Sequence, residues 1–240
     1  MKNKKVLLII PAYNEEENIL NTYNKIKKYN TDNKTNYDII VINDGSRDNT
    51  ENILDENNIP HITLIHNLGI GGAVQTGYKY AYENEYDIAV QFDGDGQHDI
   101  NYVKNIIEPI IKGKADFVIG SRYIDKTTSK FKSTVARQLG IKLISNFIKM
   151  VTHKKIYDTT SGFRACNKKI IKEFSIEYPL EYPEPITTAE LLKEGYSVSE
   201  VAVSMNERTG GQSSIKAWKN AYYMVNVILS ILLVGIRRYK

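Results

Sequence analysis

Cysteine is nearly absent from this chain. Cys166 is the only cysteine among the 240 residues, which excludes an intramolecular disulfide and a zinc site that needs several thiolates. A reducing compartment fits this composition best, because chains that depend on disulfides are typical of oxidising ones.

Long hydrophobic runs are scarce as well. The run from Val6 to Ile10 ends at Pro11, which makes it too short for a signal peptide and favours a first β-strand. The run from Tyr222 to Ile236 has about fifteen residues, short of the roughly twenty that cross a bilayer. Basic residues follow it. We therefore expect a helix that lies in a membrane interface, pairs with another subunit in a homo-oligomer, or docks on a small membrane protein.

The chain also lacks a strong excess of either charge, since its formal net charge is +4. Its hydrophobic content of 42% and charged content of 25% exclude disorder as the main state. The charge is nevertheless uneven, because residues 112–155 contain eleven Lys or Arg and only two acidic residues. Such a basic belt attracts phosphate groups. No RNA-reading aromatic motif or recognition-helix pattern accompanies it, so no nucleic acid is expected as a partner.

Short apolar runs alternate with helical patterns along the chain, and the length suits one large domain. The predicted strands are Val6–Ile10, Tyr37–Ile42, His61–Ile65, Ile88–Phe92 and Asp116–Ile119. The predicted helices are Glu15–Tyr29, Thr50–Asn57, Gly71–Glu83, Ile100–Lys112, Thr134–Val151 and Ile186–Lys193. This alternation predicts an α/β fold in which helices cover both faces of a parallel sheet.

Polar clusters follow three of these predicted strands. The first strand leads into Pro11–Glu15, the second into Asn43–Ser46, and the fourth into Asp93–Asp95. In open parallel sheets the ligand binds beyond the carboxyl ends of the strands. We therefore expect the three clusters to meet at one edge of the sheet.

The turn at residues 93–98 is the most informative of these clusters. Asp93 and Asp95 are separated only by Gly94, and Gly96 follows. Two carboxylates so close repel each other unless a positive charge lies between them, and the glycines allow a tight turn. A divalent cation would satisfy both carboxylates and leave positions for phosphate oxygens. The alternative is an ordinary polar turn, because Asp and Gly are common turn residues.

Five motifs follow one another along the chain. They are Pro11-Ala12-Tyr13-Asn14-Glu15, Val41-Ile42-Asn43-Asp44-Gly45-Ser46, Asp93-Gly94-Asp95-Gly96-Gln97-His98, Gly120-Ser121-Arg122-Tyr123 and Asp158-Thr159-Thr160-Ser161-Gly162-Phe163-Arg164. In this order and spacing the chain resembles family 2 glycosyltransferases, in particular the dolichyl-phosphate mannose synthase and polyprenyl-phosphate glycosyltransferase branch. The resemblance covers about Val6 to Ser214. It implies the GT-A fold, a nucleotide-binding, mostly parallel open sheet flanked by helices.

We assign residues 1–215 to this GT-A domain. Residues 216–240 are assigned to a C-terminal amphipathic, apolar helix that associates with a membrane or a subunit.

The resemblance also implies which residues bind the donor. Nucleotide binding is expected of Pro11, Ala12, Tyr13, Glu15, Asp44, Gly72, Asp93 and Gly94. A Mg²⁺ or Mn²⁺ cofactor is expected on Asp93, Asp95 and Gln97, where it would neutralise charge on the departing diphosphate. His98 is left out of this metal set and is expected to be a hydrogen-bonding neighbour. Glu15 has an alternative role as an acid at a helix N-terminus.

A glycine-rich turn, residues 68–73, begins one of the predicted helices. Many relatives carry Lys or Arg where this chain has Ile70, so the turn lacks a charge for phosphate. We expect it to pack close to the donor sugar or its diphosphate by shape alone.

Arginines are expected to provide the acceptor half of the site, because a guanidinium binds phosphate through two parallel hydrogen bonds. The expected catalytic set is Asp93, Asp95, Arg122, Arg164 and Arg208, and acceptor binding is expected of Arg122, Arg137, Ser161, Arg164, Glu184 and Ser213. Arg137 has an alternative role as a solvated helix residue, and Glu184 has one as a helix cap.

These expectations describe an inverting, metal-dependent hexosyltransferase. Its donor is a nucleoside-diphosphate sugar, with UDP favoured over GDP, and its acceptor is a polyprenyl phosphate at the cytoplasmic face of the cell membrane, where the protein is peripheral. Such an acceptor is already anionic near neutral pH and needs little general-base help. Two alternatives stay open: transfer to a hydroxyl of a lipid-linked or growing cell-surface glycan, and a non-catalytic membrane-associated binding module.

Overall fold

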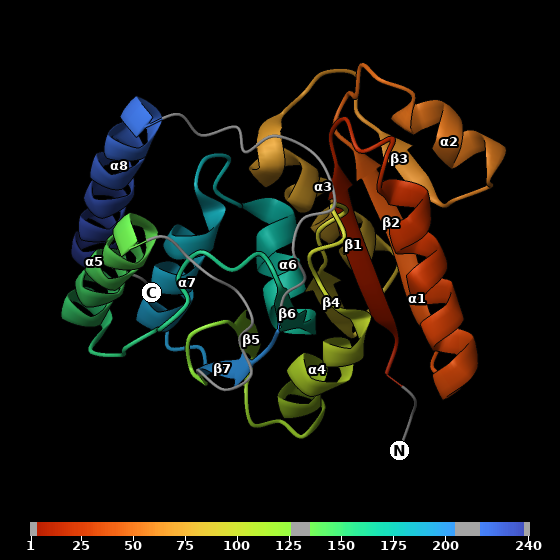
Figure 1. Cartoon of the computed structure of the whole chain (residues 1–240). Helices are drawn as coiled ribbons and strands as arrows, with labels where there is room; N and C mark the ends of the chain where they lie inside the picture. Colours follow the sequence, from red (N-terminus) through yellow and green to blue (C-terminus); the bar gives the residue numbers. More distant parts are fainter. Residues whose placement is uncertain (1–3, 126–134, 205–216, 238–240) are drawn as a thin grey trace.

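The protein is built on one seven-stranded sheet with the strand order β3-β2-β1-β4-β6-β5-β7. The computed structural model describes residues 4–125, 135–204 and 217–237. The strands are β1 (Val6–Ala12), β2 (Tyr37–Asn43), β3 (His61–Thr63), β4 (Ile88–Gln91), β5 (Phe117–Ser121), β6 (Arg164–Asn167) and β7 (Val198–Ala202). The expected open, mostly parallel α/β sheet is therefore confirmed (Figure 1).

Strand β6 is the exception to the parallel arrangement. It pairs antiparallel with β4 on one side and with β5 on the other. Its first residue, Arg164, lies opposite both Gln91 of β4 and Ile119 of β5. Because β6 runs in the opposite direction, the loop before it reaches the same sheet edge as the carboxyl ends of the other strands.

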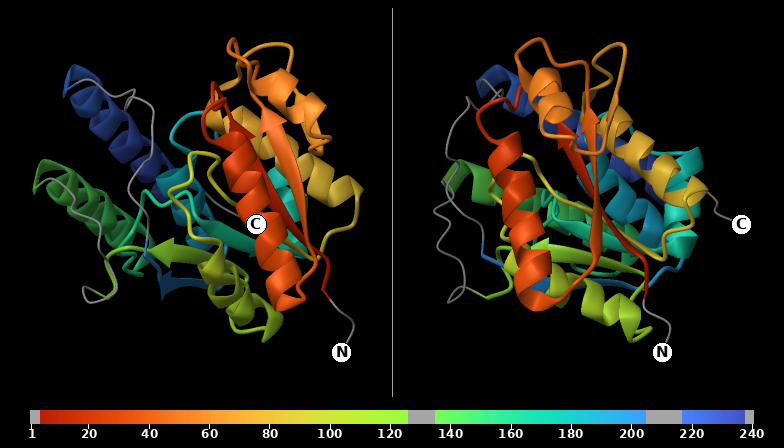
Figure 2. Two further views of the ribbon diagram at one scale, coloured as in Figure 1. Left: turned by 45° about the vertical axis from the view of Figure 1, so that its right-hand side comes forward. Right: turned by 90° about the vertical axis from the view of Figure 1, so that its right-hand side faces the viewer.

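Helices cover both faces of this sheet, as the alternation predicts (Figures 1 and 2). One face packs against α3 (Gly69–Glu83), α5 (Val135–Thr152), α6 (Lys168–Ile176), α7 (Pro183–Lys193) and α8 (Ala217–Ile236). The other packs against α1 (Ile19–Asn33), α2 (Thr50–Glu56), the 3₁₀ helix η1 (Ile100–Tyr102) and α4 (Val103–Ile111). Alternate residues of β1 enter the two cores, which is the period of two that a strand imposes.

The first helix begins later than the sequence pattern predicts. Helix α1 starts at Ile19, whereas we expected Glu15. Asn14 has a left-handed φ of 56°, and residues 15–18 form a turn in which Glu15 O accepts hydrogen bonds from the backbone N–H groups of Asn18 and Ile19. The polar loop after β1 is therefore longer than expected.

The apolar C-terminal run forms helix α8, which lies beside α5 on the opposite side of the molecule from α1 and α2 (Figure 1). Val227, Ile231 and Val234 face inward and are at most 5% exposed. This spacing of three and four residues is that of one helix face. Within the described residues, no helix is long and apolar enough to cross a membrane.

Ion pairs connect the end of α8 to the end of α6 and to α7. One guanidinium nitrogen of Arg237, directly after α8, lies 3.6 Å from a carboxylate oxygen of Glu177 and 3.9 Å from one of Glu190. Burial raises the pKa of Glu190 to about 7, the nearby charge of Glu194 adds to this, and Arg237 opposes it. Glu190 therefore takes up a proton more readily in the folded protein than in the unfolded chain.

We expect Glu190→Gln to stabilise the protein at pH 8 and to have little effect at pH 5. A carboxyl with a raised folded pKa favours folding at low pH, and this contribution is lost as pH rises from the ordinary value of 4.5 through about 7. The amide does not ionise, so the stability of the variant does not fall over this pH range. Thermal unfolding at pH 8 should therefore show a free energy of unfolding about 1–2 kcal/mol higher than that of the wild type. Glu177→Gln, at a side chain that is 77% exposed, is the control. Equal gains at both pH values would contradict the assignment.

Candidate active site

Hydrogen bonds bring the polar clusters of the sequence together at one edge of the sheet. The backbone N–H of Asp44, after β2, donates to Ala12 O at the end of β1 over 2.8 Å. The backbone N–H of Asn14 donates to Ser46 Oγ over 3.0 Å, and a Cβ placed on Gly94 would lie 3.3 Å from Pro11 O. The expectation that the clusters after β1, β2 and β4 converge is confirmed.

Asp44 connects this edge to helix α3. It is 3% exposed, and its Oδ1 accepts a hydrogen bond of 2.7 Å from the backbone N–H of Leu68, next to Gly69. Burial raises the pKa of Asp44, while the backbone N–H groups of Leu68 and Gly69 act in the opposite direction. The Asp44 carboxylate thus holds the start of α3. A contact between Asp44 and the nucleotide stays a prediction.

The loop after β1 forms one wall of a cleft of about 390 Å³. The cleft is lined by Asn14, Glu15, Glu16, Glu17, Asn18, Arg47 and Asp48. A carboxylate oxygen of Glu15 accepts from Asn18 Nδ2 over 3.0 Å, so the side chain stabilises the turn and also faces the cleft. Tyr13 is 42% exposed, whereas Ala12 is buried and Pro11 half-buried. Of these residues Tyr13 offers the most accessible ring for a nucleotide base.

The Asp93 to His98 turn begins two residues after the end of β4. The Asp93 side chain is 31% exposed and Asp95 is 8% exposed, so Asp93 offers the more accessible carboxylate. Asp95 Oδ1 accepts from the backbone N–H of Gln97 over 3.0 Å. The backbone N–H of Asp93 donates to His98 Nδ1 over 2.9 Å. His98 therefore contacts Asp93 as a hydrogen-bonding neighbour, as the sequence led us to expect.

The loop before β6 packs against this turn. A Cβ placed on Gly162 would lie 3.1 Å from both carboxylate oxygens of Asp93, so only glycine allows this approach without displacing the carboxylate. The Phe163 ring stacks on His98 with the centroids 4.6 Å apart. Residues 161–163 therefore form a second wall beside Asp93.

Arg122 has a buried carboxylate partner. It is 5% exposed, and its guanidinium donates to both carboxylate oxygens of Asp158, over 2.7 and 2.8 Å. Burial disfavours the charged guanidinium, but the hydrogen bonds and charge of Asp158 outweigh this and raise the pKa of Arg122. The pair joins the end of β5 to the loop before β6. A phosphate contact for Arg122 stays a prediction.

Arg164 and Ser161 lie inside the protein. Arg164 is 1% exposed, and its Nε donates to Ser161 O over 2.6 Å while Nη1 donates to Thr187 Oγ1 of α7 over 2.9 Å. The Ser161 side chain is fully buried and donates to Gly120 O over 2.6 Å. Both side chains hold the loop before β6, and their predicted contact with the acceptor stays untested.

Among the described members of the acceptor set, Glu184 is less buried than Arg122, Ser161 and Arg164. It lies in the first turn of α7 and is partly exposed. Burial raises its pKa, the positive charge of Arg164 opposes this, and the negative charge of Asp93 adds to it. The carboxyl therefore lies close enough to Asp93 and Arg164 to interact with their charges.

The glycine-rich turn packs closely against the chain itself. A Cβ on Gly71 would lie 2.3 Å from Pro179 O and 2.5 Å from Leu180 Cα, and one on Gly72 would lie 2.5 Å from Leu68 Cβ. The close approach at Gly71 is thus to the backbone of the chain itself. The expected packing of this turn on a donor stays a prediction for Gly72.

We expect Gly71→Ala to lower the free energy of unfolding by about 1–3 kcal/mol, the usual cost of overpacking against a backbone that cannot move aside. Chemical denaturation measures it. Gly140→Ala in α5 is the control, since its Cβ would lie 3.4 Å from the flexible Met224 side chain. That variant should be neutral or stabilising because alanine favours helix. Equal losses in both variants would contradict the packing argument.

Three predicted residues cannot be placed at this site. Arg208 and Ser213 lie outside the described residues, and Arg137 lies in α5 with its side chain outside the described part. The structure adds three residues to the site that the sequence did not predict there: Asp158, Gly162 and Phe163. All three lie in the motif at residues 158–164. The position of Asp158 just after the basic residues 112–155 could have indicated it as a partner for an arginine.

A mostly parallel open sheet flanked by helices, with paired aspartates after one of its central strands, places this protein in the class of GT-A fold proteins. Glucosyl-3-phosphoglycerate synthase from Mycobacterium tuberculosis, solved with Mn²⁺, UDP-glucose and phosphoglyceric acid, has this fold. It matches with a TM-score of 0.72 and 16% identity over 99% of this chain and 82% of that chain.

The family model for glycosyl transferase family 2 matches residues 7–175. The chain belongs to this glycosyltransferase family. It is 35% identical to the UDP-N-acetylglucosamine–dolichyl-phosphate N-acetylglucosaminyltransferase of Methanococcus voltae, over 85% of this chain and 86% of the relative. It is 26% identical to the polyprenol monophosphomannose synthase of Mycolicibacterium smegmatis, over 88% of this chain and 81% of the relative.

Proposed function

We propose that this glycosyltransferase transfers a sugar from a UDP-sugar to a polyprenyl phosphate at the cytoplasmic face of the membrane. The observation that carries the proposal is the meeting of the Asp93 turn, Asp44 and the loop after β1 at one edge of the sheet. The names of the Methanococcus voltae and Mycolicibacterium smegmatis relatives support a lipid phosphate as acceptor.

The residues predicted to bind the metal suit Mg²⁺ or Mn²⁺. Asp93 and Asp95 supply carboxylate oxygens and Gln97 an amide oxygen, the ligands that such hard cations prefer. Within the described residues, no group of three or more His, Cys, Asp and Glu side chains is placed to enclose a metal ion. Two carboxylates leave positions for diphosphate oxygens, and a cation bound there would stabilise the charge on the leaving nucleoside diphosphate.

The chain's own residues supply positioning. The loop after β1, with Tyr13 and Glu15, would bind the nucleotide, while Asp44 holds the start of α3. An acceptor phosphate is anionic at neutral pH, so its oxygen attacks the anomeric carbon without losing a proton first. Arg122 and Arg164 set the shape of the acceptor side by holding the loop before β6.

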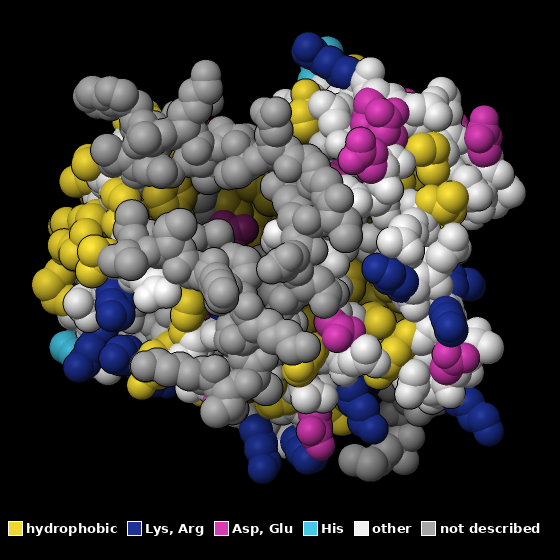
Figure 3. Space-filling model, viewed as in Figure 1, with side chains coloured by type: hydrophobic (Ala, Val, Ile, Leu, Met, Phe, Trp, Pro, Cys, Tyr) yellow, Lys and Arg dark blue, Asp and Glu magenta, His cyan; other side chains and the backbone are white. Residues whose placement is uncertain are grey.

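Helices α5 and α8 provide the face for peripheral membrane attachment in this proposal. Their exposed apolar side chains are Leu139, Leu143, Met150, Tyr222, Val225, Leu229, Leu233 and Ile236. Neither helix contains Asp or Glu, and Lys142 and Lys149 of α5 are exposed. Figure 3 shows apolar side chains gathered over these helices, with Lys or Arg beside them. Apolar area bordered by cations favours an anionic lipid surface.

A transfer assay tests the reaction. Radiolabelled UDP-sugars and GDP-sugars are incubated with Mn²⁺ and a short-chain polyprenyl phosphate in anionic vesicles, and label in the lipid phase is counted. We expect transfer from a UDP-sugar and its loss on chelation. Label in a soluble saccharide but never in lipid would overturn the acceptor. Consumption of no donor at all would favour a binding module.

Vesicle sedimentation tests the membrane face. We expect Leu229→Gln combined with Leu233→Gln to lower the vesicle-bound fraction at least about fivefold, because two apolar side chains leave the contact. The matched control is Ile65→Gln combined with Ile111→Gln, at exposed positions away from α8. Equal binding by both double variants would exclude this face.

A hydroxyl acceptor is the second candidate, and Glu184 is the observation that favours it. A carboxyl whose pKa is raised and which lies near Asp93 has the properties of a general base. If the acceptor is a glycan hydroxyl, Glu184→Gln should lower kcat by about 100-fold or more. If the acceptor is a lipid phosphate, the same variant should retain most of its kcat.

A further inference from the structure

His98 makes two contacts with the same aspartate. Its Nδ1 accepts the hydrogen bond of 2.9 Å from the backbone N–H of Asp93, and its Nε2 lies 3.2 Å from Asp93 Oδ2. Because Nδ1 is an acceptor, a neutral ring carries its hydrogen on Nε2, the nitrogen that contacts the carboxylate. The ring therefore holds the backbone and the side chain of Asp93 at once.

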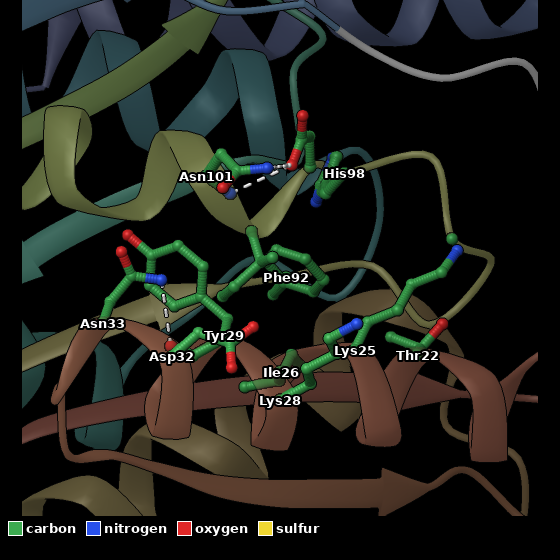
Figure 4. A pocket seen from close by; sticks show the side chains of 13 residues that line it. Thr22, Lys25, Ile26, Lys28, Tyr29, Asp32, Asn33, Phe92, His98 and Asn101 are labelled. Atoms are coloured by element: carbon green, nitrogen blue, oxygen red, sulfur yellow. Dashed lines mark hydrogen bonds between the residues drawn. The ribbon is translucent and has the colours of Figure 1, made fainter.

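The imidazole itself is held by two aromatic rings. The His98 side chain is 1% exposed. Phe163 stacks on it with an interplanar angle of 21°, and Phe92 meets it edge-on with the centroids 5.4 Å apart. Figure 4 shows His98 and Phe92 at the inner wall of a cleft of about 340 Å³ between α1 and η1. The ring has a fixed place in the protein.

We propose that His98 is the positioning residue that orients the Asp93 carboxylate toward the cation. The inference rests on the proposed function, since it assigns a partner to the cation-binding residue of that site. Gly162 leaves the space that the carboxylate occupies, and the 3.2 Å contact between His98 Nε2 and Asp93 Oδ2 helps to fix the direction of the carboxylate. Hydrogen-bond partners of metal ligands commonly change metal affinity by about 10- to 100-fold.

The test measures Mn²⁺ affinity of the protein with saturating UDP, by electron paramagnetic resonance of free Mn²⁺. His98→Phe keeps a ring between Phe92 and Phe163 but removes the hydrogen bond at Nδ1 and the contact of Nε2 with Asp93 Oδ2. We expect it to weaken Mn²⁺ binding by about 10- to 100-fold and to leave UDP affinity without metal within about twofold. His98→Gln can place an amide N–H near the position of Nε2 and should recover part of the affinity. His98→Asn is too short to do so.

His61→Phe is the matched control, since His61 lies on β3 and bonds Ile59 O instead of a site residue. Unchanged Mn²⁺ affinity in His98→Phe would overturn the proposal. If that variant does not fold, equal Mn²⁺ affinities of His98→Gln and His98→Asn would overturn it, as would a wild-type protein that binds no Mn²⁺. Absence of transfer to polyprenyl phosphate alone would overturn the proposed acceptor and leave this comparison intact.

Discussion

Asp93→Asn should lower kcat for sugar transfer by about 1000-fold, because one of the two carboxylates that face the leaving diphosphate loses its charge. The Asp93 carboxylate is the more accessible of the pair and receives the contact from His98. The amide is nearly the same size, so packing against Gly162 is retained. Initial rates at saturating donor and Mn²⁺ measure the effect.

The control for this variant is Asp99→Asn, which changes an acid in the same segment. Asp99 Oδ1 accepts from the backbone N–H and the side-chain amide of Asn101 and so stabilises η1. We expect this variant to keep kcat within about threefold, since its bonds are those of a cap. If Asp93→Asn retains more than a tenth of the wild-type kcat, the assignment of the catalytic cation site is wrong.

Asp158→Asn is expected to give the largest loss of stability, about 3 kcal/mol or more, because it leaves the Arg122 guanidinium buried without its countercharge. Asp158 is fully buried, and its carboxylate also accepts a hydrogen bond of 3.0 Å from the Arg122 backbone N–H. For a chain of this size the loss corresponds to a fall in Tm of roughly 6–12 °C. Thermal and chemical denaturation both measure it.

Asp55→Asn is the comparison, because the Asp55 side chain is 67% exposed and contacts His61 Nε2 at 3.6 Å. Exposed pairs contribute at most about 1 kcal/mol, so this variant should change Tm by no more than about 4 °C. Similar Tm values for the two variants would show that the buried pair does not stabilise the end of β5.

The sequence alone predicted the part of the fold that depends on local patterns. The five predicted strands are present because a buried parallel strand needs a short apolar run and a polar loop where it ends. β6 and β7 were missed for the same reason. β6 starts with Arg164 at a buried position, and β7 is half-buried throughout. Neither shows an apolar run.

The donor side of the site could be predicted because its members follow strand ends directly. Asp44 comes immediately after β2 and Asp93 two residues after β4, and parallel strands bring their carboxyl ends to one edge. Sequence position therefore implies proximity for these residues. The turn with Asp93 and Asp95 also needs no distant contact to form.

The tertiary structure alone decided the partners of residues far apart in the chain. The pairing of Arg122 with Asp158 and the burial of Arg164 beside Thr187 depend on an antiparallel strand inserted between β4 and β5. Gly71 likewise meets the backbone of Pro179 from a distant segment. Residue type shows that an arginine needs a partner, but only the packing of the chain determines whether that partner is a phosphate or a carboxylate of its own.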